Sequence, residues 1–285
     1  MKKGILSIIL IIILSISVFA LPDELLNDVA RAKKEGKLKK AVSLLNPYIN
    51  TGGYKVIREL AEVYIYFKEY KKAESIYSRY CPEIGSASLY NDYGDLLVKL
   101  EKYDTALDIF KRAVKIKEIG LLYNKIGKMN EKLNRKKAAV EAYKKAVSLS
   151  PEKVRYYNNL GVLYISMGKY DSAYKYLTDG VKIDPGYPGV KYNLAVVYMK
   201  RNQFNNAIGL LKSILKYGDP DYLVNLGYCY YNIKDYNHAL EIFKKLKKSG
   251  EYTEIVNFNL GLVYSQKGSY EKALDYFFKA LKKNK

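Results

Sequence analysis

Four asparagines recur at one place in the sequence, each directly before a leucine: Asn159, Asn193, Asn225 and Asn259. A side-chain amide carries both a hydrogen-bond donor and an acceptor. A row of such amides can therefore bind the backbone of an extended peptide, whatever the side chains of that peptide. The same amides can instead contact the backbone of a neighbouring helix and brace the fold. Both interpretations remain open at this point.

Catalysis and metal binding find little support in the sequence. His238 is the only histidine, which excludes a His-rich metal site. No nucleotide-binding loop, paired-cysteine motif or HExxH motif is present. Cys81 and Cys229 are isolated, which predicts two small buried apolar side chains rather than a disulfide framework. We therefore predict a non-enzymatic protein with no cofactor and no metal.

The elements that position the asparagines belong to one repeated unit. An alanine follows an aromatic or apolar residue by three positions in most units, from Leu38/Ala41 to Tyr270/Ala273. Successive alanines of this pattern are 32 to 34 residues apart. A period this steady is typical of a repeat array. The alanines are Ala41, Ala73, Ala106, Ala139, Ala173, Ala207, Ala239 and Ala273.

Each unit has the pattern of two helices. In one unit, Leu160, Leu163 and Tyr164 recur at helical spacing. Gly168 then permits a turn, and Pro185 ends the second helix because the residue before a proline avoids helical backbone. One such pair cannot bury its apolar face alone, so neighbouring pairs must stack.

These residues resemble the tetratricopeptide-repeat (TPR) family. The family pattern is matched by Leu160, Gly161, Tyr164, Gly168, Tyr170, Ala173 and Pro185. The resemblance covers residues 22–285 and implies an all-α, right-handed superhelical solenoid of about eight helix-turn-helix repeats. The expected repeats are 22–53, 54–86, 87–119, 120–153, 154–187, 188–219, 220–253 and 254–285.

The first twenty residues predict an export signal. Two lysines precede an apolar run at 5–19, and Val18 and Ala20 fit the small-residue rule for cleavage before Leu21. An uncleaved N-terminal anchor is the alternative. The solenoid at 21–285 would then lie in the periplasm or elsewhere in the cell envelope.

In the TPR family the first helix of each repeat lines the concave face, so the resemblance places the recurring asparagines in a groove. Exposed apolar surface in such a groove usually marks a partner site. This predicts that a peptide or helix of a partner protein binds there. The N-terminal part of the groove is charged, with Arg58, Asp92, Asp95 and Lys125 among its candidate residues. Its C-terminal part is largely apolar and includes Tyr192, Val196, Met199, Tyr228, Tyr231, Phe258 and Leu262.

The chain is strongly basic, with a formal net charge of +20 at pH 7 and lysine runs at 33–40, 244–248 and 282–285. The export signal argues against nucleic acid and favours an anionic envelope polymer or a membrane surface as the partner of these runs. A solvated outer face explains the same runs without any ligand. We therefore expect a scaffold that assists assembly of cell-envelope machinery, with a binder of anionic polymer or membrane as the alternative.

The last expected helix carries an apolar stripe, Leu274, Phe278 and Leu281, in addition to the residues that pack inside its own repeat. In earlier repeats the next helix would cover such a stripe, and solenoid ends normally have a polar cap. We expect this stripe to form a homo-oligomer or to dock on a partner.

Overall fold

A computed structural model describes residues 21–250 and 252–281 of the chain. Within these ranges the chain contains α-helices and no strands, and the helices follow one another in eight pairs. The predicted all-α, TPR-like solenoid is therefore confirmed. The export signal expected at 1–20 lies outside the described residues. None of the described helices combines the length and apolar character needed to cross a membrane.

The pairs are α2 (Asp23–Lys34) with α3 (Leu38–Leu45), α4 (Gly53–Tyr66) with α5 (Tyr70–Ile84), α6 (Ala87–Lys99) with α7 (Tyr103–Ile116), α8 (Gly120–Lys132) with α9 (Lys136–Leu149), α10 (Val154–Ser166) with α11 (Tyr170–Ile183), α12 (Pro188–Lys200) with α13 (Phe204–Ile214), α14 (Pro220–Asn232) with α15 (Tyr236–Ser249), and α16 (Thr253–Gln266) with α17 (Tyr270–Leu281). Two short 3₁₀ helices, η1 (Asn46–Tyr48) and η2 (Leu215–Tyr217), follow α3 and α13.

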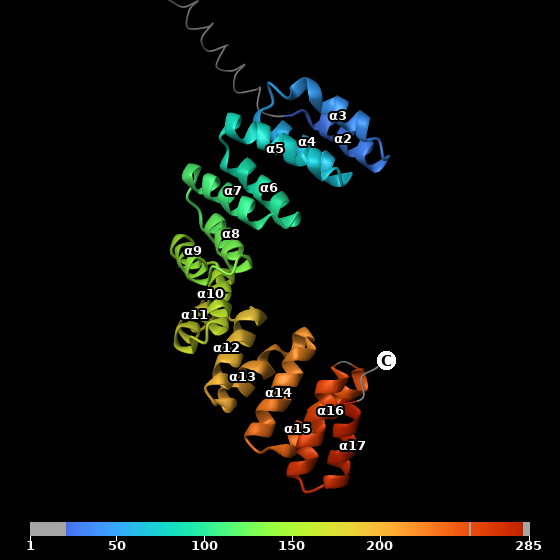
Figure 1. Cartoon of the computed structure of the whole chain (residues 1–285), viewed down its shortest axis with the longest axis vertical. Helices are drawn as coiled ribbons and strands as arrows, with labels where there is room; N and C mark the ends of the chain where they lie inside the picture. The colour runs from blue at the N-terminus through green and yellow to red at the C-terminus, as the bar shows by residue number, and fades with distance from the viewer. Residues whose placement is uncertain (1–20, 251, 282–285) are drawn as a thin grey trace, which may run out of the picture. The chain divides into compact units, whose positions relative to one another are not determined.

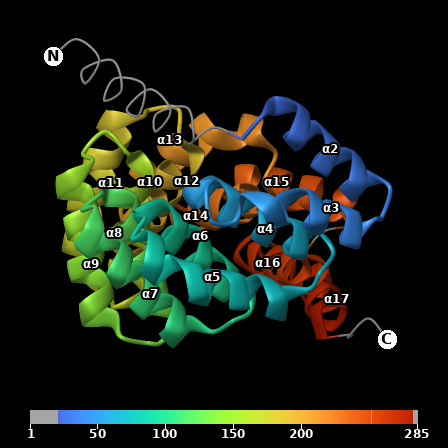
Figure 2. The same cartoon turned by 90° about the horizontal axis from the view of Figure 1, so that it is seen from above.

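The helices form two compact units, divided between residues 149 and 150. The first unit contains α2 to α9 and the second contains α10 to α17. Figure 1 shows that, within each unit, one helix pair follows the next along the chain. Figure 2 shows α4, α6 and α8 along the inner side of the first unit, with α5, α7 and α9 along its outer side.

The two helices of each pair approach closely at small residues. All eight alanines of the repeat pattern are buried, with exposed fractions of 3% or less. In the pair α14–α15, a Cβ atom on Gly227 would lie only 2.6 Å from the Phe243 ring, so glycine is needed for this ring to pack against the first helix. Phe243 shares one core with Val256 and Leu260 of α16. The core of one pair is thus completed by the next pair.

The turn inside every pair contains one residue with left-handed backbone, five positions before the buried alanine. Gly36, Gly168 and Gly268 take this position in three of the turns, as expected for Gly168 from the sequence. In the other five turns a residue other than glycine adopts the same backbone conformation, which costs an L-residue about 1–2 kcal/mol. These residues are Lys68, Glu101, Asn134, Asn202 and Lys234, with φ between 56° and 64°.

We predict that Lys234→Gly stabilises the second unit, because glycine adopts φ of +64° without a steric penalty. The expected gain in the free energy of unfolding is about 1 kcal/mol, since the more flexible unfolded chain offsets part of the benefit. Chemical denaturation measures the change. The matched control, Gly168→Ala, should lower the free energy of unfolding by a similar amount, and equal stability of both variants would contradict the prediction.

Candidate functional site

The recurring asparagines belong to a longer row of polar residues, one per repeat, fourteen positions before the buried alanine. We call this place the row position. In the first unit it is occupied by Asn27, Glu59, Asp92 and Lys125, and in the second unit by Asn159, Asn193, Asn225 and Asn259. Each row residue lies on the first helix of its pair. The row therefore follows the helices that are expected to line the groove.

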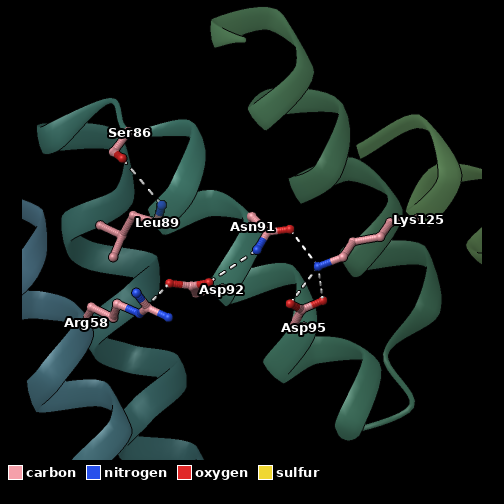
Figure 3. Close-up of polar contacts among 7 residues, drawn as sticks. All are labelled: Arg58, Ser86, Leu89, Asn91, Asp92, Asp95 and Lys125. Carbon is pink, nitrogen blue, oxygen red and sulfur yellow. Dashed lines mark hydrogen bonds and ion pairs between the residues drawn. The ribbon is translucent and has the colours of Figure 1, made fainter. Parts of the chain in front are cut away.

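In the first unit, the row residues Asp92 and Lys125 bond to residues of the preceding repeat. Arg58 Nε of α4 lies 3.0 Å from Asp92 Oδ2 of α6 (Figure 3). Lys125 Nζ of α8 donates to Asn91 Oδ1 of α6 at 2.6 Å and also pairs with Asp95. Arg58 and Asn91 both stand one residue before the row position of their own repeats. A row residue is therefore joined twice to the residue that precedes the row position one repeat earlier, once between α6 and α4 and once between α8 and α6.

The second unit repeats this arrangement with neutral groups. Asn193 Nδ2 of α12 donates to Asn158 Oδ1 of α10 at 2.8 Å. Asn225 Nδ2 of α14 donates to the Tyr192 hydroxyl of α12 at 2.8 Å. Asn158 and Tyr192 again stand one residue before the row position. These bonds join side chain to side chain, rather than side chain to the backbone of a neighbouring helix.

Asn259 shows what decides the partner of a row residue. The residue one position before the row position in the preceding repeat is Val224, whose side chain has no polar group. Asn259 Nδ2 instead donates to the Ile255 carbonyl of its own helix at 2.9 Å. An amide at the row position therefore bridges two repeats only where the earlier repeat offers an acceptor. Asn159 lies half-buried on α10.

The charged groups of the first-unit row largely satisfy one another. The Asp92 side chain is only 15% exposed, and burial raises the pKa of its carboxyl, while the charge of Arg58 acts in the opposite direction. Burial, followed by the negative charge of Asp92, also raises the pKa of the Tyr77 hydroxyl on α5. Any ligand of these charges would have to compete with Arg58–Asp92 and Lys125–Asp95. Asp92 and Lys125 are therefore better suited to bracing the repeats than to binding a ligand.

A pocket of about 400 Å³ lies along the row in the second unit, between α12 and α14. Five residues predicted from the sequence to bind a partner line it, and one further residue, Lys200, was missed. Lys200 stands eight residues after Tyr192 on α12, so the helical spacing of the apolar positions could have revealed it. The lining residues are Tyr192, Val196, Met199, Lys200, Asn225 and Tyr228.

The pocket combines apolar surface with groups that can accept or donate a hydrogen bond. Burial, with a smaller effect of the Asp221 charge, raises the pKa of the Tyr192 hydroxyl. The hydroxyl therefore keeps its proton at neutral pH and can donate it to a ligand while it accepts from Asn225. The Tyr228 ring is 42% exposed and packs edge-on against Phe204. Lys200 makes no ion pair with any other described residue.

The remaining predicted residues lie outside this pocket. Tyr231 packs against Tyr236 with ring centroids 5.8 Å apart, and Leu262 is half-buried on α16. Phe258 is 51% exposed and lines a separate apolar pocket of about 450 Å³ between α16 and α17. The predicted stripe on α17 is exposed, with Phe278 at 63%.

Candidates for covalent or metal chemistry are placed unfavourably. Cys81 and Cys229 are buried, as predicted, and burial raises the pKa of both thiols to about 12. His238 is exposed, contacts Asp235 through Nδ1 at 2.6 Å and stacks on Tyr230. In the part of the chain that the structure describes, no group of three His, Cys, Asp or Glu side chains is arranged to hold a metal ion.

The fold and the groove residues define a helical-repeat solenoid built from helix-turn-helix pairs. Tetratricopeptide-repeat family profiles match residues 87–119, 120–168, 164–223, 220–249 and 256–285. The chain belongs to the tetratricopeptide-repeat family. This membership indicates a protein-interaction scaffold. A search of curated proteins finds no match.

Solved structures show the same fold. A tetratricopeptide-repeat protein from Parabacteroides merdae is 15% identical, with a TM-score of 0.60 over 80% of this chain and 91% of that chain. YrrB, described as a TPR protein with an unusual peptide-binding site, is 22% identical, with a TM-score of 0.54 over 60% of this chain and 90% of its own. MamA is 25% identical, with a TM-score of 0.52 over 55% of this chain and 92% of its own.

We predict that Asn193 and Asn259 differ in their effect on stability. Asn193→Ala leaves the half-buried Asn158 carbonyl oxygen without its donor and should lower the free energy of unfolding by about 1 kcal/mol. Asn259→Ala removes only a bond to its own helix and should change it by less than about 0.5 kcal/mol. Chemical denaturation tests both variants. If Asn193→Ala proved as harmless as Asn259→Ala, the row would not brace the repeats.

Proposed function

We propose that this protein is an exported, non-enzymatic scaffold that binds an extended segment of a partner protein in the groove of its second unit. The observation that carries the proposal is the pocket between α12 and α14, where five residues predicted from the repeat pattern meet. Tetratricopeptide-repeat membership supports a protein as the partner class. YrrB, a relative by fold, is described as having a peptide-binding site, which agrees with this assignment.

The chemistry of the pocket indicates which kind of segment it would accept. Val196, Met199 and the Tyr228 ring offer an apolar surface for one side chain of the partner. The Tyr192 hydroxyl and the side-chain carbonyl oxygen of Asn225 can bond to the backbone of that segment. Lys200 provides a positive charge that no other described residue neutralises in an ion pair. We therefore expect an apolar side chain beside an acidic residue in the partner.

The export part of the proposal rests on the sequence. Two lysines, an apolar run at 5–19 and small residues before Leu21 have the order of a cleavable signal. A partner would accordingly belong to the cell envelope, where the scaffold would assist assembly of envelope machinery. An uncleaved anchor would leave the same groove available at the membrane surface.

Photo-cross-linking in the native cell tests this function. A benzophenone amino acid in place of Tyr228, whose side chain is 42% exposed, should give discrete protein adducts that mass spectrometry identifies. The same probe at Ile116, which is 47% exposed on the first unit, is the matched control and should give few adducts. Lys200→Glu should reduce the adducts of the Tyr228 probe about tenfold, equivalent to a loss of about 1.4 kcal/mol in binding.

Lys245→Glu, which reverses one charge on α15 outside the pocket, should leave these adducts unchanged. Recovery of lipid or glycan alone at Tyr228 would contradict the proposed protein partner. Equal adduct yields at Tyr228 and Ile116 would show that the pocket is not the binding site.

A second candidate function, binding of an anionic envelope polymer or membrane surface, is favoured by the lysines of α13 and α15. None of these lysines forms an ion pair with another described residue. The only acidic residue on the two helices is Glu241, so the local charge is strongly positive. The lysines of α13, η2 and α15 are Lys212, Lys216, Lys244, Lys245, Lys247 and Lys248.

We predict that salt separates the two functions. Binding of the full chain to vesicles that contain anionic lipid, or to an acidic polysaccharide, should fall about tenfold between roughly 50 and 200 mM salt if the α15 lysines carry it. Replacing Lys244 and Lys248 by glutamate should abolish it, whereas Tyr228→Ala should not. Binding that survives high salt and requires Tyr228 would exclude the polyanion function.

A further inference from the structure

The pocket between α12 and α14 has a charged residue at each end. Lys200, the last residue of α12, lines it and is exposed. Asp221 lies one turn before Asn225 and therefore on the same face of α14 as this lining residue. Asp221 is half-buried and, like Lys200, makes no ion pair with another described residue. Two opposite charges thus lie at one pocket without neutralising each other.

The two helices run in the same direction, which places these charges at opposite ends of the pocket. Asn225 Nδ2 donates to the hydroxyl of Tyr192, which lies in the first half of α12. Tyr228, one turn further along α14, packs against Phe204, which follows the end of α12. Asp221 precedes Asn225 on α14 and therefore lies at the Tyr192 end, away from the lysine.

The charge of Asp221 acts on the pocket itself. Burial, and after it the negative charge of Asp221, raises the pKa of the Tyr192 hydroxyl, so the carboxylate lies close to this lining residue. Capping of the helix does not occupy that carboxylate. Asp219 takes this role, because its Oδ1 accepts from the backbone N–H of Asp221 at 2.9 Å. The Asp221 side chain is therefore placed to meet a positive group of a ligand.

Few other charges lie on the first helices of the second unit. Asp221 is the only acidic residue of α10, α12 and α14, and Glu254 is the only one of α16. The basic residues of these helices are Arg155 of α10 and Lys191 and Lys200 of α12. Lys191 donates to the Ser213 hydroxyl, and Arg155 does not line the pocket. A partner in the pocket therefore meets one negative and one positive charge, with apolar side chains between them.

The spacing of the two charges indicates the conformation of the bound segment. Tyr192, beside Asp221, and Lys200 are eight residues apart, which is about 12 Å along a helix axis. An extended chain covers this distance in about four residues, at about 3.3 Å each. Alternate side chains of an extended chain point to the same side, so residues i, i+2 and i+4 would all face the pocket. A helical segment would instead need its charges about seven or eight residues apart.

We infer that the partner segment is extended and carries a basic and an acidic residue four positions apart, with an apolar residue midway between them. The basic side chain pairs with Asp221 and the acidic side chain with Lys200. The apolar side chain enters between them, against Val196 and Tyr228. This inference rests on the proposed groove function and adds the order of charges to it. Ion pairs at the rim of a site contribute mainly to specificity, so the charges select the segment that the apolar side chain holds.

Fluorescence anisotropy of the full chain with labelled, end-blocked peptides tests the inference. The probes Gly-Lys-Thr-Phe-Thr-Glu-Gly and Gly-Glu-Thr-Phe-Thr-Lys-Gly carry the two charges in opposite chain directions. One of them should bind about tenfold more tightly than the same peptide with two lysines or with two glutamates. Equal affinities of all four peptides would overturn the inference. Tighter binding of a peptide whose charges are seven residues apart would also overturn it, because that spacing belongs to a helix.

Exchange of the two charges gives a result that a purely structural role of Asp221 would not produce. In the double variant Asp221→Lys with Lys200→Asp, the preferred probe should change from one chain direction to the other. Asp221→Asn alone should weaken the preferred probe about fivefold. Glu254→Lys changes the first-turn acid of α16, outside the pocket, and is the matched control that should leave the preference intact. An unchanged preference in the double variant would contradict the assigned pairs.

Tyr228→Ala separates this inference from the function on which it rests. If the groove binds the peptides, this variant should weaken all four of them, since each carries the phenylalanine. Binding that depends on Tyr228 but ignores the charges would overturn the inference and leave the groove function intact. Binding that does not depend on Tyr228, or no binding of any peptide, would overturn both.

Discussion

Every other feature of the structure depends on the close approach of two helices at a buried alanine. The eight alanines of the pattern are nearly inaccessible to solvent, and larger residues at these places would separate the helices. Where a ring such as Phe243 lies on the second helix, a glycine on the first helix makes room for it. A pair closed in this way still exposes apolar side chains, which the next pair must cover. The regular spacing of the first helices follows from this packing, and with it the polar row.

Much of this could be predicted because packing follows the period of the sequence. The alanine spacing gave the number of pairs, and helical periodicity identified Tyr192, Val196, Met199 and Tyr228 as neighbours on one side. The turns were less predictable. Lys234 adopts left-handed backbone because the packing of α14 against α15 imposes the turn between them, although its own preference is against it.

The bonds of the recurring asparagines could not be read from the repeat pattern alone. Asn193, Asn225 and Asn259 are equivalent in the pattern, yet they bond to an amide, a hydroxyl and a backbone carbonyl. The difference comes from the residue that the preceding repeat offers, which the period leaves unspecified. The deciding residue stands one position before the row position in the preceding repeat. It is Val224 for Asn259, and it carries a polar side chain for the other two asparagines.

The residues at the row position also suit the two units to different roles. In the first unit three of the four row residues carry a full charge, and two of them, Asp92 and Lys125, are each held by groups of the chain itself. A ligand there would have to replace strong internal pairs. In the second unit the row carries amides, and an amide that donates one bond keeps an acceptor for another molecule. Asn225 can therefore brace α14 against α12 and still present its carbonyl oxygen to the pocket, so bracing and binding need not exclude one another at this residue.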